Sequence, residues 1–265
     1  MSKAGTFRQL HNHSTPLLLP NAWDAGSARL IEAQGASAIA TTSAGFAWSL
    51  GYPDGRLLPF DEVVASVRRI VRVLEVPLSV DVENGYADDP RIAADQVMKL
   101  AELGIAGINI EDGPDDASLL AAKIDAIKNA VAKAGLDLFV NARSDVFLAS
   151  LVEKAKQPHE AIARGNLYAS AGADGLFLPA LVQPSDIEAI VSAIRLPLNV
   201  MALPGLADAA TLGQLGVRRL SAGSGISQVV LSRTKALAAD FLAHGRSDAL
   251  NDQPLPYSEI QRLFA

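Results

Sequence analysis

The sequence contains no cysteine, only four histidines and few aromatic residues, which make up 5% of the chain. Without cysteine the protein has no disulfide, no thiolate to bind a metal and no thiol nucleophile. No apolar run approaches the roughly 20 residues needed to cross a bilayer, and residues 1–9 lack the hydrophobic core of a signal peptide. We therefore expect a cytoplasmic protein with no membrane partner.

Positive charge is also scarce, because 23 lysines and arginines face 29 aspartates and glutamates, which gives a formal net charge of -6. The isoelectric point is about 5.2. Proteins that bind nucleic acids or membrane surfaces usually present a basic face. The charge balance therefore argues against a nucleic-acid partner and against a role at a membrane surface.

Apolar residues, in contrast, are plentiful. Of the 265 residues, 49% are hydrophobic and only 20% are charged. A single α/β barrel domain commonly has about 250 residues. We expect one domain over residues 1–265, in which residues 245–265 form a hinge and a final helix that can pack on a neighbouring subunit.

Short apolar segments alternate with helical patterns along the whole sequence. The predicted strands lie at residues 17–20, 36–42, 78–81, 107–111, 138–142, 175–178, 198–200 and 218–221. A predicted helix follows each strand, and this alternation is typical of a parallel sheet. Eight such units predict a closed (β/α)8 barrel. A doubly wound open sheet is the alternative, but no Gly-x-Gly-x-x-Gly follows the first strand.

Some segments between these elements are expected to be irregular. Residues 43–45 are predicted to be a small-residue loop, and residues 46–59 a longer connection. His11 and His13 precede the first strand, and we expect both to be exposed.

Two acids follow the apolar segment at residues 78–80. If that strand extends to Glu83, the side chains of Asp81 and Glu83 leave the same face of its carboxyl end. Mg²⁺ prefers oxygen ligands and usually keeps several waters, so carboxylates at a strand end suit it. The alternative is that these acids cap the next helix or face solvent.

Active sites of barrels gather at the carboxyl ends of the strands. Carboxylates that meet there repel one another unless a cation or shared protons offset the charge. Arg143 is suited to bind a substrate carboxylate, because its guanidinium can make two parallel hydrogen bonds. The alternative is an acid–arginine network that only ties the barrel top together. Besides Asp81 and Glu83, the predicted strand ends carry Thr42, Ser43, Ala44, Gly45, Glu111, Asp112, Arg143, Asp145 and Asn199.

Asp81-Val82-Glu83-Asn84-Gly85-Tyr86 resembles the Asp-x-Asp-x-Gly-Tyr/Phe-Gly motif of the isocitrate lyase and phosphoenolpyruvate mutase superfamily, with Glu83 in place of the second aspartate. Five further segments resemble motifs of that superfamily in the same order, and together they cover about residues 17 to 145. They are residues 20–29, Thr-Ser-Ala-Gly at 42–45, Leu-Gly-Tyr-Pro-Asp at 50–54, Gly-Ile-Asn-Ile-Glu-Asp at 107–112 and Ala-Arg-Ser-Asp at 142–145.

The resemblance implies an Mg²⁺ site, with Mn²⁺ as a substitute, in which Asp81, Glu83 and Glu111 hold the ion largely through waters. The ion would bind the carboxylate and 2-oxo oxygens of a small 2-oxo acid, and Arg143 would clamp the same carboxylate. Asp54 would lie near the reacting end of the substrate. The residues predicted to bind the substrate are Trp23, Thr42, Ser43, Ala44, Gly45, Arg143 and Asn199.

The resemblance also implies a homo-oligomer, in which a C-terminal helix is exchanged between neighbouring barrels of a tetramer. A hinge at residues 245–256 and a helix at 257–264 are compatible with that exchange. A dimer, or a tail that docks on its own barrel, is equally compatible.

Residues 115–118 depart from the superfamily pattern. Isocitrate and methylisocitrate lyases carry a Lys-Lys/Arg-Cys-Gly-His loop near here, whose cysteine acts as the catalytic acid, whereas this chain has Asp-Asp-Ala-Ser. Those two activities are therefore not expected. The mutase and the phosphonopyruvate hydrolase carry a longer loop with Lys and Asn, and acidic residues in its place would repel a phosphonate.

The predicted function is an Mg²⁺-dependent lyase or decarboxylase that acts on a small 2-oxo or 2-hydroxy acid through a metal-stabilised enolate, similar to the oxaloacetate decarboxylases of the superfamily. Tyr86 and Asp54 are the candidates for protonating the enolate, and a packed ring is the alternative for Tyr86. Three other functions are considered: a C–P bond enzyme of the mutase or hydrolase type, a non-catalytic binder of 2-oxo acids, and a phosphate-binding barrel enzyme, suggested by Ser-Ala-Gly-Ser-Gly at residues 221–225.

Overall fold

The computed structural model describes residues 2–265 and contains one sheet of nine parallel strands, in the order β1-β9-β8-β7-β6-β5-β4-β3-β2. β1 (Leu17–Leu19) and β2 (Asn21–Ala22) are separated by Pro20 alone, so they act as one interrupted strand. β1 pairs with β9 and β2 pairs with β3, which closes the sheet. The predicted (β/α)8 barrel is confirmed, and its first strand is broken at a residue that cannot donate a backbone hydrogen bond.

The other strands follow the predicted apolar segments to within a few residues, because each carries the buried side chains that a sheet covered on both faces requires. They are β3 (Ile39–Thr41), β4 (Leu78–Asp81), β5 (Gly107–Glu111), β6 (Phe139–Arg143), β7 (Gly175–Phe177), β8 (Leu198–Met201) and β9 (Arg219–Ser221).

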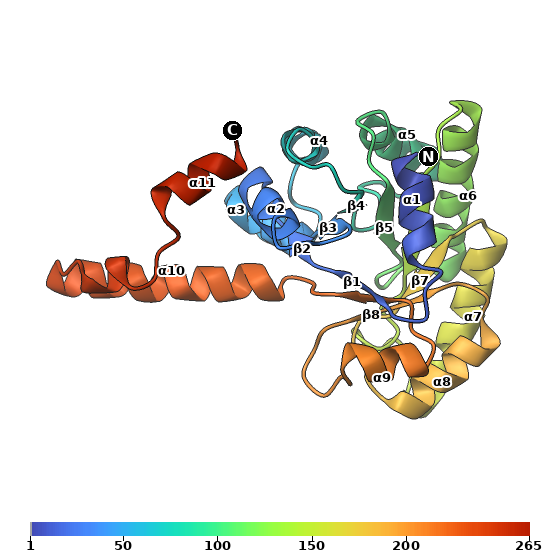
Figure 1. The fold of residues 1–265 in the computed structure, drawn as a ribbon. Helices are drawn as coiled ribbons and strands as arrows, with labels where there is room; N and C mark the ends of the chain where they lie inside the picture. The colour runs from blue at the N-terminus through green and yellow to red at the C-terminus, as the bar shows by residue number, and fades with distance from the viewer. Residues whose placement is uncertain (1) are drawn as a thin grey trace.

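Helices cover the outside of this barrel (Figure 1). Several begin at an aspartate whose side chain accepts a hydrogen bond from the first turn, as Asp89, Asp116 and Asp208 do. The covering helices are α2 (Ala25–Glu32), α4 (Phe60–Val71), α5 (Pro90–Ala101), α6 (Ala117–Lys133), α7 (Gln157–Ser170, preceded by the 3-10 turn η1, Lys154–Lys156), α8 (Pro184–Ala193) and α9 (Ala209–Gln214).

The amino-terminal end of the barrel is closed by α1 (Lys3–Leu10), a helix that the sequence analysis did not predict. Phe7 of α1 is completely buried and packs with Leu17 and Phe139 in the lower barrel interior. His11 stacks on Phe139 with the ring centroids 4.5 Å apart, and it is only 4% exposed. The prediction that His11 is exposed is therefore wrong, because the aromatic pair removes it from solvent, whereas His13 is exposed as predicted.

Residues 43–49 form the helix α3 (Ser43–Ser49), so the predicted loop at residues 43–45 is wrong and the irregular connection begins only after residue 49. Thr42 is its N-cap, and Phe46 is buried in the main core. The small residues at its start had the composition of a loop, but they fit a helix that begins directly at the end of β3.

The C-terminal helix α10 (Gly225–His244) leaves the barrel instead of covering it (Figure 1). Of its 20 residues only Ser227 is buried. After the 3-10 turn η2 (Asp248–Asn251), α11 (Tyr257–Leu263) returns to α2, where Arg29 Nε donates to the backbone oxygen of Leu263 at 2.8 Å. Within residues 2–265 no helix is both long and apolar enough to cross a bilayer.

Candidate active site

A cavity of about 170 Å³ opens where the carboxyl ends of the strands meet, and we call it the mouth cavity. Its position agrees with the end of the barrel at which barrel enzymes carry their active sites. Most of its lining is polar. The lining residues are Asn21, Thr42, Ser43, Ala44, Asp54, Asp81, Asn109, Arg143, Leu148, Phe177, Met201, Ser221, Gly223 and Ser224.

Asp81, the last residue of β4, is held in the mouth cavity by its neighbours in the fold. Its Oδ2 accepts a hydrogen bond from the Ser43 hydroxyl at 3.2 Å, and its Oδ1 accepts one from the backbone N–H of Glu83 at 3.2 Å. Its own backbone N–H donates to Thr41 Oγ1 at 2.9 Å. The carboxylate therefore has a fixed position at the edge of the cavity.

Arg143, the last residue of β6, is the centre of an ionic network at the mouth cavity. It donates to Asp145 through Nε at 2.7 Å and Nη2 at 3.0 Å, and its Nη1 lies 2.8 Å from Glu111 Oε2. Asp145 is positioned by Asp112, whose Oδ1 accepts from the backbone N–H of Asp145 at 3.0 Å. The acid–arginine network considered from the sequence is present, and Arg143 nevertheless lines the cavity.

Negative charge at this end of the barrel exceeds what Arg143 can balance. The pKa of Glu111 is raised to about 8, mainly by burial and also by the neighbouring carboxylates of Asp81, Asp145 and Glu83, although Arg143 lowers it. Burial also raises the pKa values of Asp81 and Glu83. Of the three, only Asp81 lines the mouth cavity, and Glu111 adjoins it through its ion pair with Arg143. Carboxylates with raised pKa values at and beside a cavity suit a site for an added cation or a proton transfer.

Glu83 and Tyr86 form a pair beside the mouth cavity and do not line it. β4 ends at Asp81, and Glu83 and Tyr86 have left-handed backbones with φ of 47° and 55°. β4 therefore ends where predicted and does not reach Glu83, so the condition under which Asp81 and Glu83 would share a strand face is not met. Tyr86 Oη donates to Glu83 Oε1 at 2.6 Å, and the centroid of its ring lies 5.2 Å from the centroid of the Phe60 ring. Burial and this hydrogen bond raise the pKa of Tyr86, so the phenol keeps its proton.

The residues predicted to bind substrate or to donate a proton separate into two groups. Residues 42–44 at the start of α3 line the mouth cavity, as does the exposed Asp54 of the α3–α4 connection. Trp23 and Gly45 lie against each other outside it, and a Cβ on Gly45 would lie 2.7 Å from Trp23 Cβ. Trp23 and Gly45 share a smaller cavity of about 50 Å³ with Trp48.

Asn199 lies deeper in the barrel than predicted. Its Nδ2 donates to Ser221 Oγ at 3.2 Å and its Oδ1 accepts from Asn141 Nδ2 at 3.1 Å. Both amides are buried, so Asn199 supports the floor of the cavity and does not line it.

Several lining residues were not predicted to bind the substrate, including Asn21 and Asn109. Ser221 and Ser224 also line the cavity, and the sequence suggested them only as part of a phosphate-binding segment. Asn109 had a usable signal, because it stands two positions before Glu111 on β5 and side chains two apart on a strand share a face. Ser221 ends the last strand, which is the position that identified Asp81 on β4.

The residues present suit a divalent ion that keeps most of its water. Within residues 2–265 no three acidic or histidine side chains gather closely enough to enclose a metal by themselves. Mg²⁺ does not need such a cage, because one or two carboxylates plus substrate oxygens usually hold it. Asp81 would be the direct ligand, and Glu83 and Glu111 would act through water. The raised pKa values of all three carboxylates fit this donor set, because a cation would compensate their charge.

Comparisons with known proteins show the family to which the chain belongs. The profile of the phosphoenolpyruvate phosphomutase family matches residues 7–242. An uncharacterized protein of Mycobacterium tuberculosis is 38% identical over 261 residues, which cover 97% of this chain and 95% of that protein. An oxaloacetate decarboxylase of Paraburkholderia xenovorans is 32% identical over 238 residues, which cover 84% of this chain and 77% of that enzyme.

Among solved structures, a Burkholderia cenocepacia protein described as a phosphonomutase superposes with a TM-score of 0.85 and 37% sequence identity. The match covers 89% of this chain and 99% of that structure. The family profile and the relatives thus agree over nearly the whole barrel. The chain belongs to the phosphoenolpyruvate phosphomutase family and is a lyase of the isocitrate lyase/phosphoenolpyruvate mutase superfamily.

Proposed function

We propose that the protein is an Mg²⁺-dependent lyase that cleaves a C–C bond of a small 2-oxo acid, with the decarboxylation of oxaloacetate as the reaction to test first. The observation that carries this proposal is that Arg143 and Asp81 line one small cavity. A guanidinium and an acidic metal site on one cavity suit a ligand with a carboxylate beside a chelating oxygen.

The residues of the chain would divide the work as follows. Arg143 would bind the substrate carboxylate, and the Ser43 hydroxyl, which donates to Asp81 at 3.2 Å, would keep the Asp81 carboxylate in place. The bound ion would supply positive charge beside the 2-oxo group, where negative charge develops as the bond at C3 breaks. Asp54, on the exposed connection, would deliver the proton to C3 afterwards. Tyr86 is less suited to that step, since Glu83 holds its proton.

The short connection after β5 supports a decarboxylase over other reactions of the superfamily. α6 begins at Ala117, and Asp116 is its N-cap, so residues 112–116 are too few for a long covering loop. They also provide no cysteine, histidine or lysine. A decarboxylation requires neither a thiol acid nor a cation for a phosphonate, and the relative named oxaloacetate decarboxylase fits the same reaction.

The test is a coupled assay of pyruvate formation from oxaloacetate with Mg²⁺, with and without a chelator. Asp81→Ala and Arg143→Ala should each abolish metal-dependent turnover, whereas Asp208→Ala, which removes an N-cap carboxylate from α9, should not. Turnover that is independent of Mg²⁺ or of Asp81 would contradict the proposal.

A C–P bond enzyme is the second candidate, because the similar solved structure is described as a phosphonomutase. Phosphonopyruvate should then release phosphate or isomerise in the same assay mixture. A non-catalytic binder of 2-oxo acids would do neither, and it would also fail to exchange the C3 protons of pyruvate with deuterated water.

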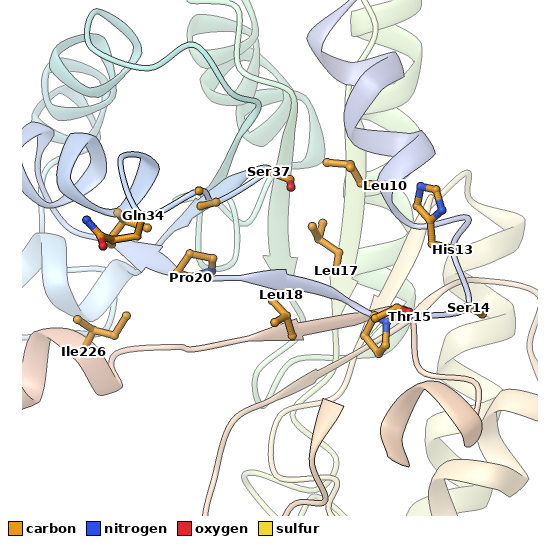
Figure 2. A pocket seen from close by; sticks show the side chains of 14 residues that line it. Leu10, His13, Ser14, Thr15, Leu17, Leu18, Pro20, Gln34, Ser37 and Ile226 are labelled. Carbon is orange, nitrogen blue, oxygen red and sulfur yellow. The ribbon is translucent and has the colours of Figure 1, made fainter. Parts of the chain in front are cut away.

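We further propose that the protein is a homo-oligomer in which α10 covers a second copy. Because α10 projects from its own barrel, a groove of about 850 Å³ stays open beside β1 (Figure 2). The groove includes Leu18, a strand residue that is 55% exposed, and Ile226 at the start of α10. An exposed strand residue of this kind is unusual in a barrel, whose strands are normally covered on both faces.

The projecting helix has the apolar surface that such a groove would accept. Val229, Leu231 and Leu242 of α10 are 70%, 50% and 84% exposed. Leu18→Arg in the groove and Leu231→Glu on α10 should each reduce the mass measured by light scattering to that of a monomer, whereas Leu167→Arg on α7 should not. A monomeric wild-type protein would contradict this arrangement.

A further inference from the structure

Directly below the mouth cavity the barrel encloses a completely buried arginine, Arg219 of β9. Its Nη2 donates to Asn109 Oδ1 at 3.1 Å, and its guanidinium lies 5.7 Å from the centre of the Phe7 ring. Its Nε and Nη1 have no hydrogen-bond partner within residues 2–265. Burial lowers the pKa of Arg219 to about 9, so the side chain is still charged at neutral pH.

A buried cation with so few partners is a poor way to stabilise a barrel. Ionic and polar groups in an interior cost free energy unless their hydrogen bonds are satisfied, and apolar replacements of similar volume are often neutral or stabilising. The presence of Arg219 is therefore better explained by its hydrogen bond to Asn109 than by a contribution to stability.

Asn109 connects this arginine to the mouth cavity. Its Oδ1 accepts hydrogen bonds from Arg219 Nη2 and from Asn141 Nδ2, the latter at 2.9 Å. A guanidinium has donors and no acceptor, so the amide oxygen, and not the nitrogen, must face Arg219. The hydrogen bond from Arg219 therefore selects one of the two orientations of the Asn109 amide, which differ in the positions of its oxygen and nitrogen.

The other end of the Asn109 amide is consequently free for a ligand. Nδ2 donates to no group of the described chain, and Asn109 lines the mouth cavity together with Asp81 and Arg143. An N–H donor that is fixed before the ligand arrives stabilises developing negative charge without having to reorganise.

We propose that Asn109 is a catalytic residue that donates an N–H hydrogen bond to an oxygen of the bound 2-oxo acid, and that Arg219 is the positioning residue that holds its amide in the donating orientation. The inference rests on the proposed function, because it assigns a partner to the oxygen on which charge accumulates. Asn109 transfers no proton. Its N–H hydrogen bond to the substrate oxygen becomes stronger as negative charge develops there.

The experiment measures binding of oxalate, a stable planar analogue of the enolate, to the full-length protein with Mg²⁺ by calorimetry, alongside turnover. Asn109→Ala should raise the dissociation constant of oxalate about 10- to 100-fold, as expected for a lost hydrogen bond to a charged group. It should lower kcat about 100-fold. Asn109→Asp should bind oxalate at least as poorly while unfolding no earlier than wild type, because the new carboxylate pairs with Arg219.

Arg219→Met distinguishes positioning from packing. It should weaken oxalate binding about 3- to 10-fold while thermal unfolding is unchanged or occurs at a higher temperature. The double variant Asn109→Ala/Arg219→Met should bind no more weakly than Asn109→Ala alone, because a positioning residue has nothing to add once its target is removed. Arg8→Met is the matched control: it removes ion pairs with Asp137 and Asp174 at the opposite end of the barrel and should leave binding unchanged.

Three outcomes would overturn the inference. Unchanged oxalate binding by Asn109→Ala would remove Asn109 from the site while leaving the proposed function intact. A further loss in the double variant would show that Arg219 acts independently of Asn109. Failure of the wild type to bind oxalate with Mg²⁺ would overturn the proposed function and this inference with it.

Discussion

The two ends of the barrel are built on opposite principles. The amino-terminal end is closed by α1, whose Phe7 and the following His11 pack on Phe139, and Arg8 forms ion pairs with Asp137 and Asp174. The carboxyl end has a cavity, left-handed residues at Glu83 and Tyr86, and carboxylates whose pKa values burial raises. One end stabilises the fold, whereas the other keeps unbalanced charge available for a ligand.

Of the variants at the two ends of the barrel, Arg143→Ala at the carboxyl end should have the largest effect. Loss of the guanidinium removes the predicted carboxylate clamp, and kcat/KM should fall about 1000-fold or more. Arg143→Lys keeps the charge but not the two parallel donors, so its activity should be intermediate. Steady-state kinetics with oxaloacetate checks both variants, and unchanged kcat/KM in Arg143→Ala would remove this residue from the site.

Phe139→Ala, at the amino-terminal end, should lower stability and leave activity nearly unchanged. Removing a ring that is only 1% exposed should lower the free energy of unfolding by about 3 to 5 kcal/mol. Chemical denaturation measures this loss, and kcat should stay close to wild type at temperatures where the variant is folded. Phe139→Leu should cost less because it leaves a smaller cavity, and a large loss of kcat in it would contradict the separation of the two ends.

Gly45→Ala tests whether activity depends on the position of α3 at the carboxyl end. Its Cβ would lie 2.7 Å from both Trp23 Cβ and Thr42 Cγ2, so α3 must shift, at a cost of about 1 to 3 kcal/mol. Turnover should fall because residues 42–44 move with α3. Gly225→Ala is the matched control, since nothing lies within 4 Å of its added Cβ. Calorimetric unfolding and turnover of the two variants should differ clearly.

The two ends should also respond to pH in opposite directions. The pKa of His11 falls from 6.5 to about 3 through burial, so the unfolded chain binds the additional proton and stability should be lost as pH falls from about 6.5. The pKa of Glu111 rises from 4.5 to about 8 through burial, so the metal-free folded protein binds the additional proton and stability should be lost as pH rises between these values.

Unfolding by denaturant across this pH range tests both slopes, each at most about 1.4 kcal/mol per pH unit for one proton. His11→Phe should remove the acid-side loss and Glu111→Gln the loss toward pH 8. Mg²⁺ should bind more tightly as pH rises toward 8, because the ion binds the deprotonated carboxylate. Unchanged slopes in both variants would show that these two groups do not determine the pH dependence.

The sequence predicted the barrel and much of its mouth for one physical reason. Buried strands are continuous apolar runs, and residues directly after such runs meet at one end of the barrel, which located Asp81 and Arg143. It did not predict the orientation of Glu83, because the chain after β4 makes a left-handed turn that the alternation of side chains does not reveal.

Residues whose environment is created by distant parts of the chain could not be predicted. His11 is buried between Phe7 and Phe139, and Phe139 lies more than a hundred residues later in the chain. Arg219 belongs to a segment that carries no other sign of a buried charge, and its partner Asn109 comes from the opposite half of the barrel. The start of α3 contains small residues that are typical of loops, and its helical state depends on Phe46 reaching the core.

The pairing of the first strand with the last has a consequence for synthesis on the ribosome. Leu18 of β1 pairs with Leu220 of β9, so the first strand to be synthesised can complete its pairing only after the last strand has been synthesised. Until then both sheet edges remain open and the growing chain exposes strand surfaces that can pair wrongly. Closure late in translation, across a strand of three residues beside a proline, makes this seam the place where a nascent chain would most need protection.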